Sequence, residues 1–584
     1  MPEGSRHLDV GLLAAYLRPE RARLLVLGVV LLVSTLAPVA GPVLLGTAID
    51  AALRGEPSGE LVAIALAFLV VTVGSDTLQV LVVWRSVHLA WRVGNRLRLD
   101  LARHALRLDL EWHSRHSAGL LIERLDGDVE AIVTFSSTAV LHLVGNALLL
   151  VGVVAVSLVI DWRAGLLIVV STAVAMGVMV RFRAIAVPAH DVEREIQSQL
   201  YGDLEERLGG LEDLRANGAG PYAVHRLQHH SHRWWHAARR AALLGDGSYT
   251  LAAAAFSVGS VLTLALGVWL HRADALSIGA LLALFRFSQM VRQPVERIAE
   301  QMREFQKAAA GARRAARLLA VEPSIPDGRG DPIPGGPLEV DLDHVSFAYK
   351  GDTDVLADLD LCVAPGHRLG VVGRTGSGKS TLGRLLARLW DVGGGAVRLG
   401  GVDVRDASLA DLRGRVAVVS QDVELLRASL RDNLTFLGTV DATDEQLWAA
   451  LRDVGLDGWA AALPGGLDTV LDDRAGLSAG QAQLLAFARV LLSNPGLVVL
   501  DEATSRLDPE TERRLSAAAD RALAGRTVVI IAHRLATLDR VDEVLVLERG
   551  RVLEHGSRAA LADDPTSHFA RLLAVSATAS EVLA

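Results

Sequence analysis

A glycine-rich stretch, "GRTGSGKST" at Gly373–Thr381, has the residue types and spacing of a phosphate-binding loop. Its glycines let backbone N–H groups close around phosphate oxygens. Lys379 can reach the β- and γ-phosphates of a nucleotide, and the Ser380 hydroxyl can bind Mg²⁺. The apolar run "RLGVVG" precedes the loop and a helical pattern follows it, as this motif requires. The predicted nucleotide-binding residues are Gly373, Arg374, Thr375, Gly376, Ser377, Gly378, Lys379, Ser380 and Thr381.

Polar residues also follow three other apolar runs. "LVVLDEATSRLD" contains Asp501 and Glu502, which could be a strand-end acidic pair facing water. Beside a phosphate loop, Asp501 is instead expected to bind Mg²⁺ and Glu502 to act as general base for the attacking water. His533, in "TVVIIAH", is expected to contact the γ-phosphate, although a lone histidine after a strand is usually structural. Gln421, in "VAVVSQD", can contact Mg²⁺ or the water.

The stretch "LSAGQ" at 477–481 lies between these motifs and opens onto an apolar helix pattern. Taken alone it is a helix start, with Ser478 as N-cap and Gln481 in the first turn. The order phosphate loop, "LSAGQ", "LDE" resembles the ATP-binding cassette (ABC) family. That resemblance implies that Ser478, Gly480 and Gln481 contact the γ-phosphate held on the phosphate loop of an opposite subunit. It also implies that Tyr349, in "VSFAYKGD", stacks on adenine, and that "SRLD" at 505–508 is the family's D-loop.

Two departures from the family pattern affect this motif. Ala479 stands where the family usually has glycine, and "DDRAGLSAGQ" is about one residue shorter than usual. Such changes are typical of half-transporters that pair with a different half, so a heterodimer is favoured over a homodimer. Glu502 and His533 are intact, so this chain's own site is expected to hydrolyse ATP, provided that the partner supplies a good signature motif.

The second half of the chain alternates short β-type runs with helical patterns, which predicts a parallel α/β domain over 338–575. Pro, Gly and Asp are concentrated just before it, which predicts a linker at 326–337. A tail at 576–584 follows the domain. The single cysteine, Cys362, excludes a disulfide framework and a cysteine-based zinc site.

The first part of the chain, 1–325, is expected to be a membrane domain. The mean hydropathy is +0.32 and 51% of residues are apolar, while the net charge of −8 argues against a nucleic-acid partner. Buried core helices are the alternative, but a soluble domain rarely holds so many long apolar stretches. Five stretches approach or exceed a bilayer crossing, and a sixth is interrupted by Arg286: Leu24–Ile49, Leu61–Trp84, Ala131–Ile160, Ala164–Val180, Gly247–Leu270 and Ala275–Val291. The predicted fold is an all-α six-helix transmembrane domain joined to an α/β P-loop ATP-binding cassette domain.

Basic residues predict the orientation. Arginines concentrate in the long loops 85–130 and 181–243, whereas the turns at 161–163 and 271–274 are very short. By the positive-inside rule both long loops, and with them both termini, are expected on the cytoplasmic side. "MPEGSRHLDV" lacks the pattern of a cleavable signal, so a multi-pass protein of the cytoplasmic membrane is predicted, in contact with lipid.

This membrane half resembles a half-size ABC exporter. Its loops at 116–132 and 208–219 resemble the two intracellular loops whose short helices dock on the nucleotide domains of that family. The resemblance implies ATP-driven transport of an unidentified substrate, with ATP and Mg²⁺ as cofactors and a second half-transporter as partner. Alternatives are an importer built on the exporter fold, as in some siderophore transporters, a mainly regulatory ATP-binding half, and a non-transport ABC ATPase acting on DNA or ribosomes.

Two polar features of the membrane half remain. Asp76 and Arg286 fall inside predicted spans, where they either reach the interface or line the transport pathway. Four histidines at helical spacing form one stripe, which is either a solvated helix face or a metal site: His225, His229, His232 and His236.

Overall fold

The computed structural model describes residues 11, 14–349, 353–420, 423–471, 477–501, 509–532 and 535–583. The chain forms two compact units, one made of residues 1–107 and 117–321 and the other of residues 108–116 and 322–584. Gln421, Glu502 and His533 lie outside the described residues, as does the stretch at 505–508.

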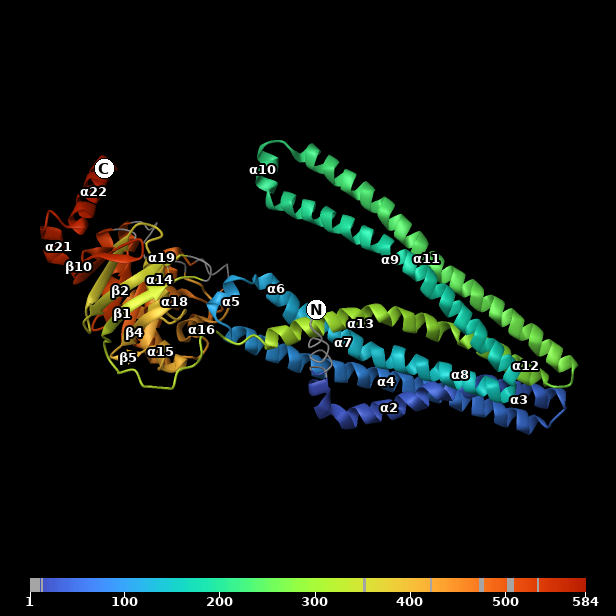
Figure 1. Ribbon diagram of the computed structural model, residues 1–584. Helices are drawn as coiled ribbons and strands as arrows, with labels where there is room; N and C mark the ends of the chain where they lie inside the picture. Colours follow the sequence, from blue (N-terminus) through green and yellow to red (C-terminus); the bar gives the residue numbers. More distant parts are fainter. Residues whose placement is uncertain are drawn as a thin grey trace. The chain divides into compact units, whose positions relative to one another are not determined.

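The first unit is entirely helical in its described part (Figure 1). Five of its helical stretches are long and apolar enough to cross a membrane, at Ala14–Leu53, Ser58–Arg107, Ala118–Ile160, Trp162–Gly209 and Gly220–Arg272. The elements are η2 (Arg18–Glu20), α2 (Arg21–Leu36), η3 (Ala37–Val39), α3 (Ala40–Leu53), α4 (Ser58–Arg107), α6 (Ala118–Ile122), η4 (Glu123–Gly127), α7 (Asp128–Ala139), η5 (Val140–Gly145), α8 (Asn146–Ile160), α9 (Trp162–Gly209), α10 (Leu211–Ala216), α11 (Gly220–Arg272), α12 (Ile278–Met290) and α13 (Arg292–Leu319).

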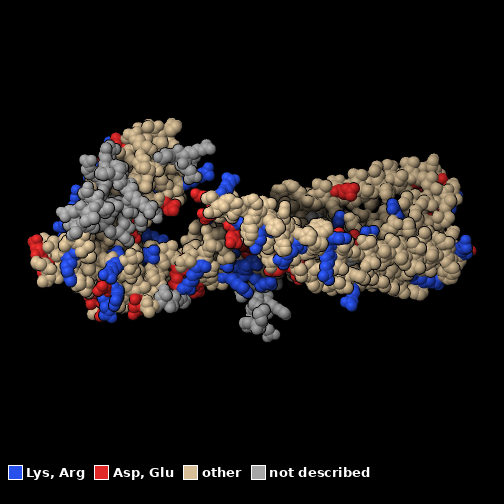
Figure 2. All heavy atoms as spheres, turned by 90° about the horizontal axis from the view of Figure 1, so that it is seen from above, with Lys and Arg blue, Asp and Glu red and all other residues tan. Residues whose placement is uncertain are grey.

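These helices expose apolar side chains on a scale that a water-soluble protein does not. On α4, Val70 is 69% exposed and Val80 is 70% exposed, and on α8 Val159 is 86% exposed. Charged side chains are sparse over much of this unit (Figure 2). Such a surface is stable in lipid and would aggregate in water.

The sixth predicted span is not among the five. The chain there is helical, but the helix is divided at Val291 into α12 and α13. Arg286 in α12 and the charged residues of α13 lower the hydropathy of this range. The helix exists as predicted, whereas its passage through the membrane remains a prediction.

A close helix pair joins the start of α12 to the end of α3. A Cβ atom at Gly46 would lie 2.5 Å from the Gly279 carbonyl oxygen, so the two backbones touch without side chains between them. Asp50 accepts hydrogen bonds from the Gly279 N–H at 2.8 Å and from the Ser277 hydroxyl at 2.6 Å. The carboxylate thereby satisfies one of the free N–H groups at the start of α12.

α9 and α11 are antiparallel neighbours joined by the short helix α10, within the second predicted intracellular loop (Figure 1). The histidine stripe lies on α11. Its last two rings meet, with the Nε2 atoms of His232 and His236 3.3 Å apart. Within the described residues, no three of these four histidines bring their ring nitrogens close enough together to hold one metal ion.

The second unit is α/β and holds two sheets. The order β10-β9-β3-β8-β7-β6 forms one sheet and β2-β1-β4-β5 the other. Its strands are β1 (Val340–Phe347), β2 (Leu356–Val363), β3 (Arg368–Gly373), β4 (Gly394–Leu399), β5 (Val402–Asp403), β6 (Val416–Val419), β7 (Leu497–Asp501), β8 (Thr527–Ile531), β9 (Glu543–Glu548) and β10 (Arg551–Ser557). In the larger sheet β9, β3, β8, β7 and β6 are parallel, and only β10 is antiparallel to its neighbour.

The helices of this unit are α5 (Leu110–Ser114), α14 (Lys379–Leu386), α15 (Leu409–Arg415), α16 (Leu430–Thr435), α17 (Asp444–Val454), α18 (Asp457–Ala462), η6 (Gly466–Asp468), α19 (Ala479–Ser493), α20 (Pro509–Leu523), η7 (Leu535–Leu538), α21 (Arg558–Asp563) and α22 (His568–Leu583). One apolar core lies between the two sheets and under α14, and a second joins the larger sheet to α17, α19 and α20. The predicted α/β domain is therefore confirmed.

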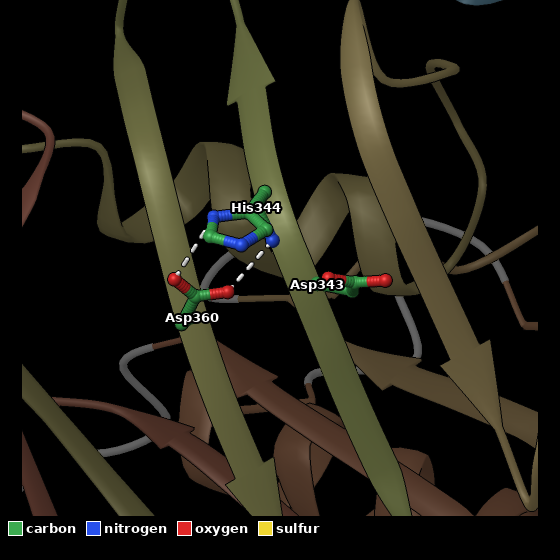
Figure 3. A group of neighbouring side chains, drawn as sticks. All are labelled: Asp343, His344 and Asp360. Atoms are coloured by element: carbon green, nitrogen blue, oxygen red, sulfur yellow. Dashed lines mark hydrogen bonds and ion pairs between the residues drawn. The ribbon is translucent and has the colours of Figure 1, made fainter.

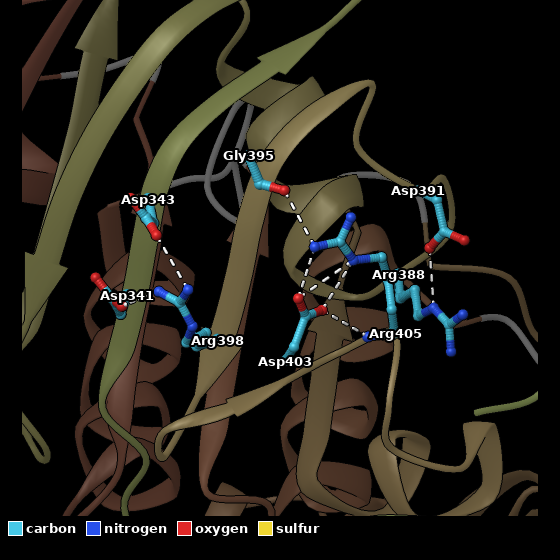
Figure 4. Close-up of polar contacts among 8 residues, drawn as sticks. All are labelled: Asp341, Asp343, Arg388, Asp391, Gly395, Arg398, Asp403 and Arg405. Carbon is cyan, nitrogen blue, oxygen red and sulfur yellow. Dashed lines mark hydrogen bonds and ion pairs between the residues drawn. The ribbon is translucent and has the colours of Figure 1, made fainter. Parts of the chain in front are cut away.

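Arginine–aspartate contacts tie the loops of this unit to its sheets (Figure 4). Arg388, whose side chain is 1% exposed, donates to Asp391 Oδ1 at 2.9 Å and to the Pro326 carbonyl at 2.9 Å. Arg405 makes a comparable pair with Asp403, but at 42% exposure. Arg388 thus holds the segment around Pro326, at the start of the nucleotide-binding unit, through a side chain that is itself buried.

We expect Arg388→Met to lower the free energy of unfolding by about 1–3 kcal/mol, because it removes the hydrogen bonds that a buried guanidinium donates to Asp391 and to the Pro326 carbonyl. Arg405→Met, the matched control at an exposed pair, is expected to cost less than about 1 kcal/mol. Thermal unfolding of the full-length variants in detergent measures both. Equal shifts in the two variants would contradict the anchoring role of Arg388.

Candidate nucleotide-binding site

The phosphate-loop candidate connects β3 to α14. Gly378 is the N-cap of α14 and has φ 100°, and Gly376 has φ 82°, so both adopt backbone conformations that favour glycine. A Cβ atom at Gly378 would also lie 2.6 Å from Leu356 Cδ2. The phosphate loop between β3 and α14 is accessible to solvent, because Arg374, Thr375 and Gly376 are exposed. The strand–loop–helix arrangement that the motif requires is present.

Lys379 is the first residue of α14 and is only 6% exposed. Its ammonium donates to the Gly373 carbonyl at 2.7 Å and to the Arg374 carbonyl at 3.1 Å. The positive charge is therefore held against the loop, at the N-terminus of a helix, where an anion is favoured.

Asp501 reaches the same edge of the sheet from β7. Ile531 of β8 pairs with Val371 of β3 on one side and with Asp501 on the other. Neighbouring strands lie about 4.8 Å apart, so the ends of β3 and β7 are separated by about 10 Å. Gln421, Glu502 and His533 follow β6, β7 and β8 in the chain. The carboxyl ends of parallel strands are the usual ligand-binding edge of an open α/β sheet.

Gly383 brings α14 close to this edge. A Cβ atom there would lie 2.9 Å from Ile531 Cδ1 and 3.1 Å from Val499 Cγ1, so the helix packs directly on β8 and β7. That contact places Ser380, which is partly buried, on the helix that covers the strand of Asp501. A hydroxyl and a carboxylate oxygen are the hard ligands that Mg²⁺ prefers, so these residues fit the ion.

Tyr349 lies beside the start of α14, close to the phosphate loop. Its hydroxyl is 3.3 Å from Thr381 Oγ1 and accepts a hydrogen bond from Arg384 at 3.0 Å. Its ring meets those of Phe347 and Trp390 edge-on. These contacts fix the ring at the rim of the loop, and its stacking on adenine remains a prediction.

The "LSAGQ" stretch forms a capping box at the start of α19. Ser478 Oγ accepts from the Gln481 N–H at 3.2 Å, and Gln481 Oε1 accepts from the Ser478 N–H at 2.9 Å. The local interpretation, a helix start, is thus confirmed. Ser478 and Ala479 are exposed while Gly480 is buried. The capped helix presents its N-terminus to solvent, as contact with another molecule's phosphate requires.

Sequence reasoning missed a buried pair behind this helix. Arg489, 8% exposed, donates to the Asn433 carbonyl at 2.7 Å and to Asn433 Oδ1 at 3.2 Å. Its guanidinium carbon lies 4.6 Å from the centre of the Phe436 ring, and burial lowers the pKa of Arg489. Asn433 is fully buried and also bonds to Leu426 in both directions. An arginine within the apolar run "LLAFARVLL" was the available signal, because such a charge needs a buried partner.

A separate group, Asp343, His344 and Asp360, has spacing compatible with a metal ion (Figure 3). Its groups are already engaged: His344 Nδ1 lies 2.8 Å from Asp358 Oδ1 and 3.2 Å from Asp360 Oδ2, and Asp343 accepts from Arg398 at 3.0 Å. The hydrogen bond to Asp358 and the charge of Asp360 raise the pKa of His344. Arg398 would oppose a cation, so this group is an ion-pair network on the smaller sheet.

Comparison with known proteins agrees with this geometry. Residues 24–295 match the family described as the ABC transporter transmembrane region, and residues 356–505 match the family described as ABC transporter. The chain belongs to the ABC transporter family. It is a half-size, exporter-type member, an ATP-hydrolysing multi-pass membrane protein that carries both domains in one chain.

Three similar proteins define its place in that family. The chain is 29% identical to an ATP-dependent lipid A-core flippase of Burkholderia pseudomallei, over 84% of this chain and 83% of the flippase. It is 33% identical to a multidrug efflux ATP-binding/permease protein of Mycobacterium bovis, over 93% of this chain and 45% of that protein. A solved structure of a bacterial Atm1-family ABC exporter with ATP bound has a TM-score of 0.77 at 23% identity, covering 95% of this chain and 98% of the exporter.

We expect Lys379→Ala to weaken ATP binding and to reduce hydrolysis by about 100-fold or more, because the buried ammonium at the loop is removed. Lys307→Ala is the matched control, since Lys307 is 66% exposed and pairs with Glu304 on α13. Phosphate release and nucleotide binding by the transporter purified with its partner subunit measure both. Normal hydrolysis in Lys379→Ala would remove this loop from the catalytic site.

Proposed function

We propose that the chain is one half of a dimeric transporter that moves its substrate out of the cytoplasm. Each chain would supply one phosphate loop and one "LSAGQ" helix, and each nucleotide would lie between the loop of one subunit and the helix of the other. The observation that carries this proposal is the pairing, in one chain, of the loop at the carboxyl edge of the sheet with the exposed N-terminus of α19. The exposed N-terminus of α19 is available to another molecule, and a second subunit would complete each site.

The chain's own residues support hydrolysis at its loop. Lys379 and the loop N–H groups would hold the phosphates, with Tyr349 against the base. Mg²⁺, bound through Ser380, Asp501 and Gln421, would neutralise phosphate charge during transfer. Glu502 would take the proton of the attacking water, and His533 would orient the γ-phosphate.

The partner is proposed to be a different half-transporter. Ala479 is the first residue of α19 and is exposed, so its methyl group stands at the surface that Ser478 would offer to the partner's nucleotide. A weakened contact there would impair only the partner's loop site. This chain's loop would keep full activity if the partner supplies a glycine-containing motif.

Export is the proposed direction. One relative is a multidrug efflux protein, and efflux is movement out of the cell, while another is a lipid A-core flippase. An importer on the same fold is the remaining alternative. Both directions require the nucleotide-binding unit and the loops 100–130 and 190–240 on the cytoplasmic side.

That topology is tested by thiol labelling. With Cys362 replaced by serine, Ser117→Cys and Gly218→Cys are expected to resist a membrane-impermeant maleimide in intact cells and to react after permeabilisation. Glu56→Cys, between α3 and α4, is the control and should react in intact cells. Labelling of the first two from outside would invert the proposed topology.

Glu502→Gln is expected to stop hydrolysis at this chain's site while ATP binding persists. The amide keeps the shape of the carboxylate but cannot accept the proton. Glu548→Gln, an exposed carboxylate at the end of β9, is the matched control. Subunit composition, from the intact mass of the complex, must be known first, because the change removes both sites of a homodimer.

In a heterodimer whose other site is impaired, Glu502→Gln should remove nearly all turnover and leave nucleotide trapped after incubation with Mg-ATP. Phosphate release and nucleotide retention are the two readouts. Substantial remaining hydrolysis would assign the chemistry to the partner's loop and leave this site a regulatory role.

A further inference from the structure

A cavity of about 510 Å³ lies among the helices of the membrane unit. Its wall is formed by η3, α3, α4, α8, α12 and the start of α13. This volume is within the range of small-molecule sites. The cavity is therefore large enough to hold a ligand rather than only water.

Two opposite charges line this cavity, Asp76 from α4 and Arg286 from α12. Both are exposed, and neither forms a hydrogen bond or ion pair with another described residue. A charge that faces lipid at the centre of a span is strongly disfavoured. Because both charges line one cavity, neither has to face lipid, and both are available to bind a ligand.

Polar side chains extend each charge along its helix. Thr72 lies one turn before Asp76 on α4 and Ser75 directly precedes it, while Gln289 and Gln293 lie one and two turns after Arg286, all on the cavity wall. Residues three to four positions apart share a helix face. The cavity thus has two polar stripes, an acidic one on α4 and a basic one on α12 and α13.

The remaining wall is apolar. It is formed by Pro38, Pro42, Leu45, Phe68, Val71, Leu149 and Met290. An apolar wall with a few convergent polar groups is the usual composition of a small-molecule site.

The two charges stand at different depths. The turn at 54–57 joins α3 to α4, and Asp50 near the end of α3 bonds to Ser277, so α4 and α12 begin near one another. At 1.5 Å per residue, Arg286 lies about 12 Å along α12 from Ile278, and Asp76 lies about 27 Å along α4 from Ser58. Counted along the helices from these starts, Asp76 therefore lies about 15 Å farther in than Arg286.

We propose that this cavity binds an elongated amphipathic zwitterion. Arg286 binds the acidic end of the ligand, Asp76 binds the basic end, and Phe68 and Leu149 contact the apolar body between them. The inference rests on the proposed transport function only for the claim that the bound molecule is then transported.

The test uses 12-aminododecanoic acid, an apolar chain with an amine at one end and a carboxylate at the other. Dodecanoic acid and dodecylamine are the probes that keep one charge each. Binding of the three tritiated probes is measured without nucleotide, on the full-length transporter and its partner subunit in lipid nanodiscs. The zwitterion is expected to bind at least about tenfold more tightly than either single-charge probe, because it makes both charged contacts.

Two variants separate the contacts. Asp76→Asn should weaken the zwitterion and dodecylamine by about tenfold and leave dodecanoic acid unchanged, whereas Arg286→Gln should weaken the zwitterion and dodecanoic acid and leave dodecylamine unchanged. Asp246→Asn and Arg181→Gln, exposed charges on α11 and α9 that do not line the cavity, are the matched controls and should change nothing.

Equal effects of both variants on all three probes would overturn the proposal, since residues that only pair with each other behave in that way. No preference for the zwitterion would overturn it too. Either outcome with ATP turnover intact leaves the transport function standing. Conversely, normal turnover in Lys379→Ala would contradict the nucleotide chemistry without affecting the binding result.

Discussion

Hydrocarbon offers no hydrogen-bond partner to a polypeptide, so every backbone N–H and C=O inside a membrane must be satisfied within the chain. This constraint explains why α4, α9 and α11 are unbroken helices over the length of a bilayer crossing, although each of them also continues beyond it. It also bears on where charged groups within the spans lie. Asp76, Arg286 and the glutamines beside them share a cavity because the lipid-facing sides of their helices cannot hold them.

In the nucleotide-binding unit, the parallel sheet determines where the polar groups meet. Strands that run in one direction deliver their following residues to one edge, so segments far apart in the sequence meet there. β3 brings the phosphate loop and β7 brings Asp501, with β8 between them. Gly383 then lets α14 lie directly on β7 and β8, which fixes Ser380 relative to the carboxylate. The site is thus determined by strand order and by the absence of one side chain.

Features encoded over short distances could be predicted from the sequence. The phosphate loop, the strands ending at Gly373 and Asp501, and the helix start at Ser478 each depend on neighbouring residues, and each is present. Features that depend on distant partners could not. The Arg489–Asn433 pair joins residues 56 positions apart, and the cavity needs helices from both ends of the membrane domain. The division of the helix at Val291, by contrast, has a local signal, because Pro294 in the first turn of α13 has no N–H with which to continue α12.

The contact between Gly46 and Gly279 has an evolutionary consequence. Because the two backbones touch, even a methyl group at either position would force the helices apart, so this junction has no tolerated intermediate variants. The cavity wall, by contrast, is formed mostly by side chains, so its chemistry is set by residues that can differ in size and charge. Exchange of the cavity's side chains can therefore change which molecules it admits, while the contact between α3 and α12 requires glycine at both positions.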